Sequence, residues 1–355
     1  MKKQLKKQIK KYFLTVFCLL LLVTVFANSS YFIKPVRFFA NKFTKISAHF
    51  ILPKGEIKTI AKISTQPKTT VKSTQPTTAN NTKTLLANAS EKGGRIISQT
   101  IDKSGANLSF GDVYVKNKTS KQIDIKKALS NKPKLNIKLN SKNPQVLIVH
   151  THATECFFPS TPQFYNKEWG ERDNNTKNNM IAVGKVIKNA LEKAGINTIQ
   201  SETLHDKDTY TGAYDNTRET IKYYLKKYPS IKVVFDVHRD AINYENGDKL
   251  RPVIDINRKT AGQIMLISGC ESGPITDYPN WQKNLRFSIG LQQAHEKTYP
   301  SLARPLFFAE KKYNQDLCEN SCLIEVGSQA NLISEAKYSA HLLSKVLVKY
   351  LTGKA

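Results

Sequence analysis

Acidic residues and cysteines are both scarce in this sequence, and each scarcity excludes a class of protein. Only 28 Asp and Glu stand against 55 Lys and Arg, which leaves a formal net charge of +27 on 355 residues. Five cysteines, an odd number spread along the chain, imply no disulfide framework. The basic excess indicates affinity for polyanions, yet no zinc-finger, basic-zipper or RNA-binding signature occurs. We therefore expect anionic wall polymers and membrane surfaces as partners, and no nucleic acid.

One long run without charge lies near the N-terminus. Residues 12–33 contain no charged side chain, and the basic tail at residues 1–11 precedes them. At about 1.5 Å per residue, this run can span a hydrocarbon core of about 30 Å. The lysines of the tail predict a cytoplasmic N-terminus, a single-pass anchor in the cell membrane and an extracytoplasmic remainder. Basic residues after the run and the sequence Val25-Phe26-Ala27 leave a cleaved signal peptide as the alternative, which also exports the chain.

Residues 34–94 form the expected low-complexity linker. Between positions 53 and 88, Thr, Lys, Gln, Ser, Asn and Pro predominate, so few side chains can build a core. This composition predicts a disordered tether. Residues 95–144 regain apolar spacing, for example in GDVYVKN at 111–117, which is typical either of a membrane-proximal arm or of a small subdomain.

Strand and helix patterns alternate densely over residues 145–355, the expected catalytic domain. Apolar runs typical of buried strands lie at 145–149, 197–200, 232–236, 263–268 and 321–327. Helical spacing occurs at 180–191, where Gly195 is the expected cap, and at 217–227, 281–297 and 334–350. The alternation predicts an α/β fold with a mostly parallel twisted sheet and helices on both faces, preceded by the transmembrane helix and the disordered linker.

Polar residues that can carry chemistry gather at the expected strand ends. His150, His152 and Glu155 follow the first strand within six positions, and His238 and Glu325 lie at or near later strand ends. Sites in such sheets form beyond the carboxyl ends of the strands. Two His and one carboxylate with an open position form a common catalytic zinc set, and a further carboxylate can move the proton. Glu325 is the candidate for that further carboxylate.

Several sequence segments together resemble the stage II sporulation protein P family, in order and at comparable spacing over about residues 146–347. They are HTHATE (150–155), FDVHRDA (235–241), YPSLARPLFF (299–308), YNQDL (313–317) and LIEVGSQANLISEA (323–336). That family is similar to the zinc-dependent N-acetylmuramoyl-L-alanine amidases. The resemblance implies a peptidoglycan hydrolase that cleaves the bond between N-acetylmuramic acid and the L-alanine of the stem peptide during forespore engulfment. It leaves open a second activity on peptide cross-links.

The resemblance also implies roles for single residues and for partners. The Zn²⁺ ligands would be His150, Glu155 and His238, and Glu325 would be the catalytic acid and base. The gap from His150 to Glu155 is shorter than in the general amidases, so whether His152 replaces one of these ligands stays open. The partners implied are a glycan-cleaving sporulation protein and a multi-pass membrane protein of the engulfment machinery.

Two residues within the family-like segments are candidates for binding substrate. Arg239, next to His238, can hold a substrate carboxylate or orient the imidazole, and a surface ion pair is the plain structural alternative. Asn314 can line the groove before Glu325, together with Arg304.

Two other functions remain compatible with the sequence. In a cysteine hydrolase, Cys156 would be the nucleophile and His238 its base. In a non-catalytic wall-binding protein, the basic surface would hold anionic polymers and Glu325 would have no chemical role.

Overall fold

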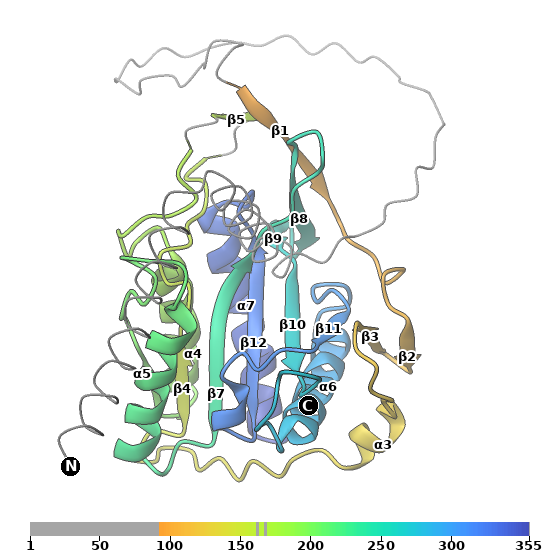
Figure 1. The fold of residues 1–355 in the computed structure, drawn as a ribbon, viewed down its shortest axis with the longest axis vertical. Helices are drawn as coiled ribbons and strands as arrows, with labels where there is room; N and C mark the ends of the chain where they lie inside the picture. Colours follow the sequence, from red (N-terminus) through yellow and green to blue (C-terminus); the bar gives the residue numbers. More distant parts are fainter. Residues whose placement is uncertain (1–91, 161–162, 167–168, 355) are drawn as a thin grey trace, which may run out of the picture. The chain divides into compact units, whose positions relative to one another are not determined.

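A computed structural model describes residues 92–160, 163–166 and 169–354 of this chain (Figure 1). These residues all belong to one unit, Thr65–Ala355. The predicted cytoplasmic tail and membrane anchor, and all but the end of the predicted linker, lie outside the described residues. Among the helices that are described, none has the length and apolar character needed to cross a membrane.

A large mixed sheet forms the centre of this unit. Its eight strands within the described residues follow the order β2-β3-β11-β10-β12-β7-β4-β6. In chain order they are β2 (Leu108–Phe110), β3 (Val113–Asn117), β4 (Val146–Val149), β6 (Thr198–Gln200), β7 (Val233–Asp240), β10 (Ile264–Gly269), β11 (Leu306–Ala309) and β12 (Ser321–Ser328).

The sheet consists of two parallel blocks that run in opposite directions. Strands β6, β4, β7 and β12 are parallel to one another, and β10, β11 and β3 form a second parallel set. The blocks meet at the antiparallel pair of β10 and β12, and β2 is antiparallel to β3. The described region thus has a mixed α/β fold in which most neighbouring strands of the main sheet are parallel.

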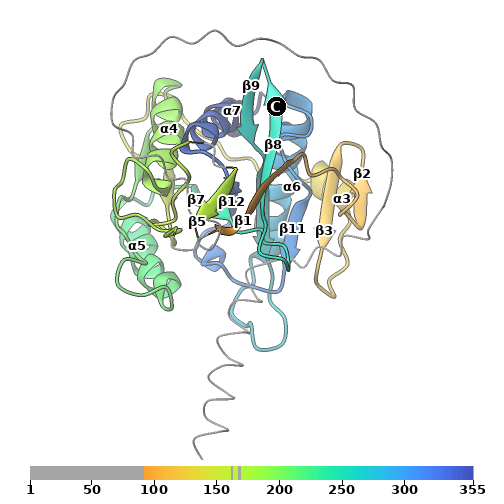
Figure 2. The ribbon, with the colours of Figure 1, turned by 90° about the horizontal axis from the view of Figure 1, so that it is seen from above.

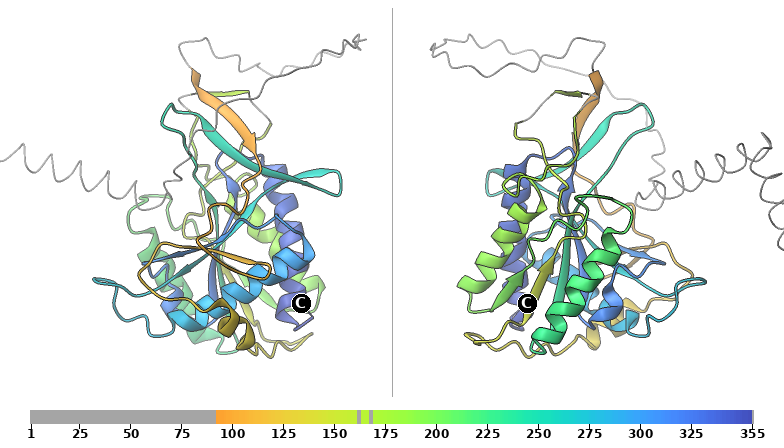
Figure 3. Two further views of the ribbon diagram at one scale, coloured as in Figure 1. Left: turned by 90° about the vertical axis from the view of Figure 1, so that its right-hand side faces the viewer. Right: turned by 60° about the vertical axis from the view of Figure 1, so that its left-hand side comes forward.

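Helices cover the two faces of this sheet unequally. The main core lies on the face that carries Ile148, Phe235 and Ile324. Figure 2 shows α4, α7 and α6 along that face and α5 on the other, and Figure 3 shows α4 and α5 on opposite sides of the strands. The helices are α3 (Ile125–Ser130), α4 (Met180–Lys193), α5 (Ala213–Lys227), α6 (Trp281–Thr298) and α7 (Ile333–Leu351), with a short 3₁₀ helix, η2 (Gln315–Leu317).

A smaller sheet lies at the carboxyl end of β7, where the chain leaves the main sheet. Its order is β5-β1-β8-β9, built from β1 (Lys92–Gln99), β5 (Phe164–Asn166), β8 (Lys249–Ile256) and β9 (Lys259–Gly262). Arg95 of β1 donates through both its backbone N–H and its guanidinium to Asp248. Residues 95–144 therefore contribute strands to both sheets, and β8 and β9 form a hairpin that the sequence patterns did not predict.

Most predicted elements are confirmed, with shifts at their ends. Gly195 has a φ of 81°, and its N–H donates to the carbonyl of Glu192, as expected for a glycine that ends a helix. Helix α5 begins four residues before the predicted start. Strand β7 runs on through Asp240, so His238 lies within the strand and projects from one of its faces.

Candidate active site

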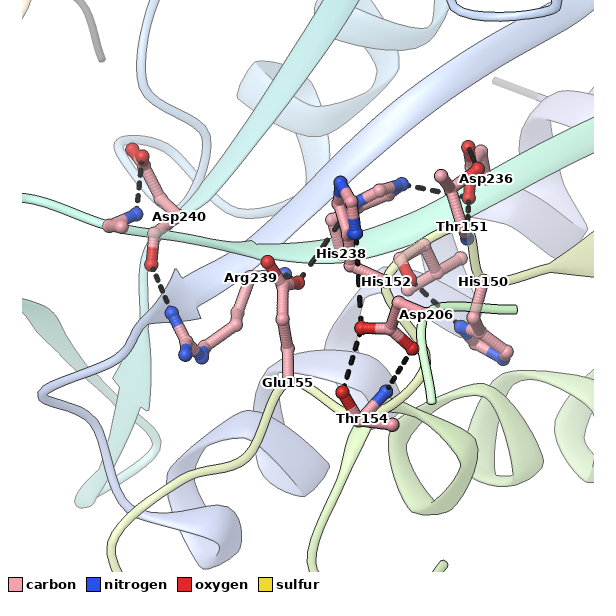
Figure 4. Close-up of polar contacts among 12 residues, drawn as sticks. His150, Thr151, His152, Thr154, Glu155, Asp206, Asp236, His238, Arg239 and Asp240 are labelled. Carbon is pink, nitrogen blue, oxygen red and sulfur yellow. Dashed lines mark hydrogen bonds and ion pairs between the residues drawn. The ribbon is translucent and has the colours of Figure 1, made fainter. Parts of the chain in front are cut away.

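The polar residues meet on the face of the sheet that α5 partly covers. Because side chains alternate along a strand, Asp236, His238 and Asp240 of β7 project from the same face. Glu325 of β12 pairs in register with His238, so the two side chains lie on neighbouring strands on one face. The loop after β4 brings His152 and Glu155 to the same place (Figure 4).

His238 lies between two carboxylates. Its Nε2 is 2.8 Å from Oδ1 of Asp236, and its Nδ1 is 3.8 Å from Oε2 of Glu155. Thr151 fixes Asp236, because its backbone N–H and its hydroxyl donate to the two carboxylate oxygens at 2.9 and 2.6 Å. Burial opposes a charge on His238, but Asp236, Glu155 and Glu325 outweigh it and raise the pKa of this imidazole to about 10.

His152 is buried against aromatic rings. It stacks on Tyr210 with ring centroids 4.1 Å apart, and it meets His238 edge to face at 5.4 Å. Its Nδ1 has no hydrogen-bond partner and lies 3.8 Å from Oδ2 of Asp206, a carboxylate that accepts two hydrogen bonds from Thr154. Burial, with the charge of His238, lowers the pKa of His152 to about 2, so the ring is neutral and can act as a ligand.

The two glutamates complete the cluster. Oε2 of Glu155 accepts the backbone N–H of Arg239 at 3.3 Å, and burial raises the pKa of this carboxyl. Glu325 is 8% exposed, and its Oε2 has no hydrogen-bond partner. Burial and the nearby Asp240 raise the pKa of Glu325 to about 8, against the opposing charge of His238. A carboxyl of this kind can hold or release a proton near neutral pH.

His150 points away from this cluster, as Figure 4 shows. Its Nδ1 donates to the carbonyl of Val237 at 2.8 Å, and its Nε2 is 3.0 Å from Nε2 of Gln200. Burial lowers the pKa of His150 to about 4, so the ring is neutral. The structure therefore brings together Glu155, His238 and Glu325 of the predicted site and adds His152, whereas His150 packs on the α4 side of the sheet.

The sequence patterns missed the residues that support the cluster. Asp236 had a signal, because it lies two positions before His238 on a strand and so shares its face. Tyr210 and Tyr214 lie near the start of α5, and no motif marked them. Asp206 follows β6 in an irregular segment, and no periodicity placed it near His152. Across the described residues, no three His, Cys, Asp or Glu side chains are gathered closely enough to enclose a metal ion as they stand.

Comparison with known proteins identifies the family. Residues 55–348 match the family model described as stage II sporulation protein P (SpoIIP). The chain belongs to the stage II sporulation protein P family.

One relative within this family is stage II sporulation protein P of Bacillus subtilis (strain 168). It is 27% identical over 216 residues, which cover 57% of this chain and 49% of that protein. The match thus spans about half the length of this relative.

Solved structures that match part of this chain include two from Clostridioides difficile. An N-acetylmuramoyl-L-alanine amidase from Clostridium difficile 630 has a TM-score of 0.36 and 15% identity, and the match covers 61% of this chain and all of that one. The CwlD amidase, solved in complex with the GerS lipoprotein, has a TM-score of 0.37 and 12% identity over 59% of this chain and 99% of that one. TM-scores below 0.5 do not establish a shared fold.

In this stage II sporulation protein P homologue, both predicted substrate-binding residues are engaged with the protein. The guanidinium of Arg239 is buried and donates to the carbonyls of Cys156, Asp240 and Glu171. Asn314 donates to the carbonyl of Tyr214 at 2.8 Å and accepts a hydrogen bond from Arg218. Arg239 therefore holds the loop that carries Glu155, and Asn314 supports a tyrosine whose ring lies 6.4 Å from that of His238.

Two further residues of the family-like segments are buried. Arg304 forms an ion pair with Asp240 at 2.8 Å, and both side chains are at most 5% exposed. The thiol of Cys156 donates to the carbonyl of Gly170, and burial raises its pKa to about 11. A nucleophilic cysteine needs a lowered pKa, so this environment is the opposite of what a cysteine hydrolase requires.

Proposed function

We propose that this protein is a metal-dependent peptidoglycan hydrolase of sporulation that cleaves the bond between N-acetylmuramic acid and the L-alanine of the stem peptide. The observation that carries the proposal is the placement of Glu325 beside His238 on the neighbouring strand, with a buried carboxylate oxygen that has no partner. A buried acid without a partner is costly for stability, and such groups are typical of catalytic sites.

The residues present fit a zinc ion held by His152, Glu155 and His238, whose Nδ1 would give up its proton when the metal binds. Two imidazoles and a carboxylate are a common zinc donor set. Nδ1 of His238 and Oε2 of Glu155 are 3.8 Å apart, close to the roughly 3.3 Å that separates two ligand atoms on one tetrahedral zinc. Asp206 lies near His152 and Asp236 near His238, in the way that carboxylates commonly orient ligand imidazoles. We prefer His152 to His150 because the nitrogens of His150 both face protein groups.

Each residue has a defined task in this mechanism. When bound, zinc would polarise the scissile carbonyl as a Lewis acid and strengthen water as a nucleophile. Oε2 of Glu325 takes a proton from the attacking water and returns it to the amine of the departing L-alanine. Tyr210 and Tyr214 pack around the imidazole of His152 and limit the access of other water.

The setting of the enzyme is part of the same proposal. The apolar run at residues 12–33 anchors the chain in the cell membrane with its N-terminus in the cytoplasm. The part of the low-complexity linker that precedes β1, residues 34–91, would let the catalytic region reach the adjacent wall. Peptidoglycan is the substrate, and a glycan-cleaving sporulation protein and a multi-pass membrane protein of the engulfment machinery are the proposed partners.

Digestion of purified peptidoglycan tests this function. The full chain, purified in detergent, is incubated with the wall with zinc or with a chelator, and the released products are identified by mass spectrometry. We expect free stem peptides that disappear on chelation and return with zinc. Glu325→Gln should lower their rate of release by about 10²- to 10⁴-fold, the usual contribution of a general acid and base.

The matched control is Glu319→Gln, which changes an exposed glutamate paired with Lys283 and should leave the rate unchanged. An undigested wall would favour the non-catalytic wall-binding function. Equal rates of digestion by Glu325→Gln and Glu319→Gln would remove Glu325 from the mechanism. Loss of activity in Cys156→Ser, together with resistance to the chelator, would favour the cysteine hydrolase.

A further inference from the structure

An exposed arginine lies at the outer end of a series of stacked groups that begins at the site. The imidazole of His152 is buried, and it stacks on the half-buried ring of Tyr210 with an angle of 12° between the ring planes. Cζ of Arg172 lies 4.3 Å from the centroid of the Tyr210 ring, and Arg172 is exposed. The series thus leads from a proposed metal ligand to a guanidinium at the surface.

The backbone fixes this arginine relative to the site. Arg172 forms an antiparallel β-bridge with Glu155, a second proposed ligand. The preceding residue is also tied down, because the carbonyl of Glu171 accepts hydrogen bonds from Arg239 and from the backbone N–H of Cys156. A guanidinium held between a tyrosine ring and a paired backbone loses little freedom when it binds a ligand.

Arg172 differs from the other arginines near the cluster in what its donors face. The guanidinium of Arg239 is bonded to backbone carbonyls, and that of Arg304 to Asp240. Within the described part of the chain, the guanidinium of Arg172 has neither a hydrogen-bond acceptor nor a carboxylate partner, so its donors face solvent. A planar guanidinium with free donors matches a carboxylate in a two-point contact.

We propose that Arg172 binds a carboxylate of the substrate close to the scissile bond. Its Cζ lies no more than about 8.4 Å from the ring centroid of His152, since Tyr210 separates them, and this is close to the span of about two extended residues. On the proposed amidase function, the group that fits is the free α-carboxylate of the residue that follows L-alanine in the stem peptide. Arg172 would then determine specificity, because a stem peptide amidated at that position lacks the charge.

A pair of substrates that differ only in this group tests the assignment. Muropeptides with either a carboxylate or a carboxamide on the second stem residue are hydrolysed by the full chain and by Arg172→Gln. We expect Arg172→Gln to lower kcat/KM for the carboxylate substrate by about 10- to 100-fold, the usual effect of losing a hydrogen bond between charged groups. The carboxamide substrate should change by no more than about twofold, as for an ordinary surface substitution.

Two further variants separate the effect of the planar guanidinium of Arg172 from the effect of its charge and from the effect of any surface substitution. Arg172→Lys keeps the charge but loses the planar fork, and should recover only part of the preference for the carboxylate. Arg258→Gln removes an exposed arginine in the turn between β8 and β9 and should leave both substrates unaffected. Equal losses on the two substrates in Arg172→Gln, or an unchanged ratio between them, would overturn the assignment.

Binding measurements distinguish a failure of this assignment from a failure of the proposed function. The two free stem peptides are titrated into the full chain and into Arg172→Gln by calorimetry. If the wall is not cleaved, but the chain prefers the carboxylate peptide and loses this preference in Arg172→Gln, the hydrolase function fails and the binding role stands. If the wall is cleaved and neither assay shows a preference that depends on Arg172, the binding role fails and the hydrolase function stands.

Discussion

The two histidines of the HTHATE segment differ in what surrounds their rings. His150 continues the alternation of β4, and its neighbours on that face are Val146 and Ile148, which belong to the main core. Its ring is satisfied by Val237 and packs beside α4. His152 lies beyond the strand, on the opposite side, with an Nδ1 that has no hydrogen-bond partner.

Replacing each histidine in turn should show which of the two binds zinc and which supports the fold. His152→Ala should lower the zinc content of the purified chain and reduce hydrolysis by more than about 100-fold, since the loss of a ligand exceeds the effect of changing its support. His150→Gln should keep zinc and lose about 1–3 kcal/mol of stability, because buried polar groups lose their partners. Metal analysis and urea unfolding measure both effects. Loss of zinc in His150→Gln, with zinc retained in His152→Ala, would restore the ligand set implied by the family resemblance.

This difference could have been foreseen in part from the sequence. Period-two alternation places His150 on the face of Ile148, whereas Asp236 and His238 share the face of Val234. That argument needs the pairing register of β4 and β7, in which Val149 lies opposite Asp236. A register depends on contacts between distant segments, and a single strand pattern does not contain it.

At the scale of elements, α4 approaches the sheet through a glycine. A Cβ added at Gly184 would lie 2.6 Å from Nε2 of Gln200 and even closer to the ring of His150. The close packing of α4 therefore depends on the absence of a side chain at this position, and the same packing encloses the His150 ring.

Gly184→Ala should destabilise the protein by about 1–3 kcal/mol through overpacking, although alanine is favoured over glycine in helices by about 1 kcal/mol. Lys185→Ala, at the exposed neighbouring position, is the control and should be nearly neutral. Urea midpoints at neutral pH give both values. Equal stability of Gly184→Ala and the wild type would mean that α4 can move away from the sheet without cost.

The helices were easier to predict than the strands around them. Residues 180–191 carry their apolar spacing and their terminating glycine locally, so α4 could be placed almost to the residue. The hairpin of β8 and β9 could not, because β8 contains Pro252 and owes its place to pairing with β1, whose Arg95 lies 153 positions from Asp248. The reversal at β10 was equally hidden, since an apolar run is the same in either direction.

At the scale of the whole molecule, several buried histidines make stability depend on pH. His295 on α6 has neither ring nitrogen hydrogen-bonded, and burial, with the charge of Lys103, lowers its pKa to about 3. The folded state thus binds the proton less readily than the unfolded state does. The neutral ring of His295 contributes fully to stability above its unfolded pKa of about 6.5. This contribution is lost as the pH falls toward the folded pKa of about 3. His150 acts in the same direction, whereas Glu325, whose pKa is raised to about 8, acts in the opposite direction.

Urea unfolding measures the stability of the wild type at pH 7 minus its stability at pH 5. His295→Leu should reduce this difference by about 2 kcal/mol, which corresponds to removing one such group over about 1.5 pH units. The exposed His341, replaced by Gln, is the control and should leave most of the difference in place. If the stability of His295→Leu and of the wild type depended on pH in the same way, His295 would not gain a proton when the protein unfolds between pH 5 and pH 7.

The contacts between the first and last thirds of the described region also determine when the main sheet can be completed during synthesis. Lys103 donates to the carbonyl of Ala303 across 200 positions, and β3 pairs with β11. At a synthesis rate of about 5–20 residues per second, the early strands wait about 10–40 s for these partners. Glu325 enters the sheet only with β12, so a chain interrupted before β12 lacks the carboxyl group that is proposed to move the proton.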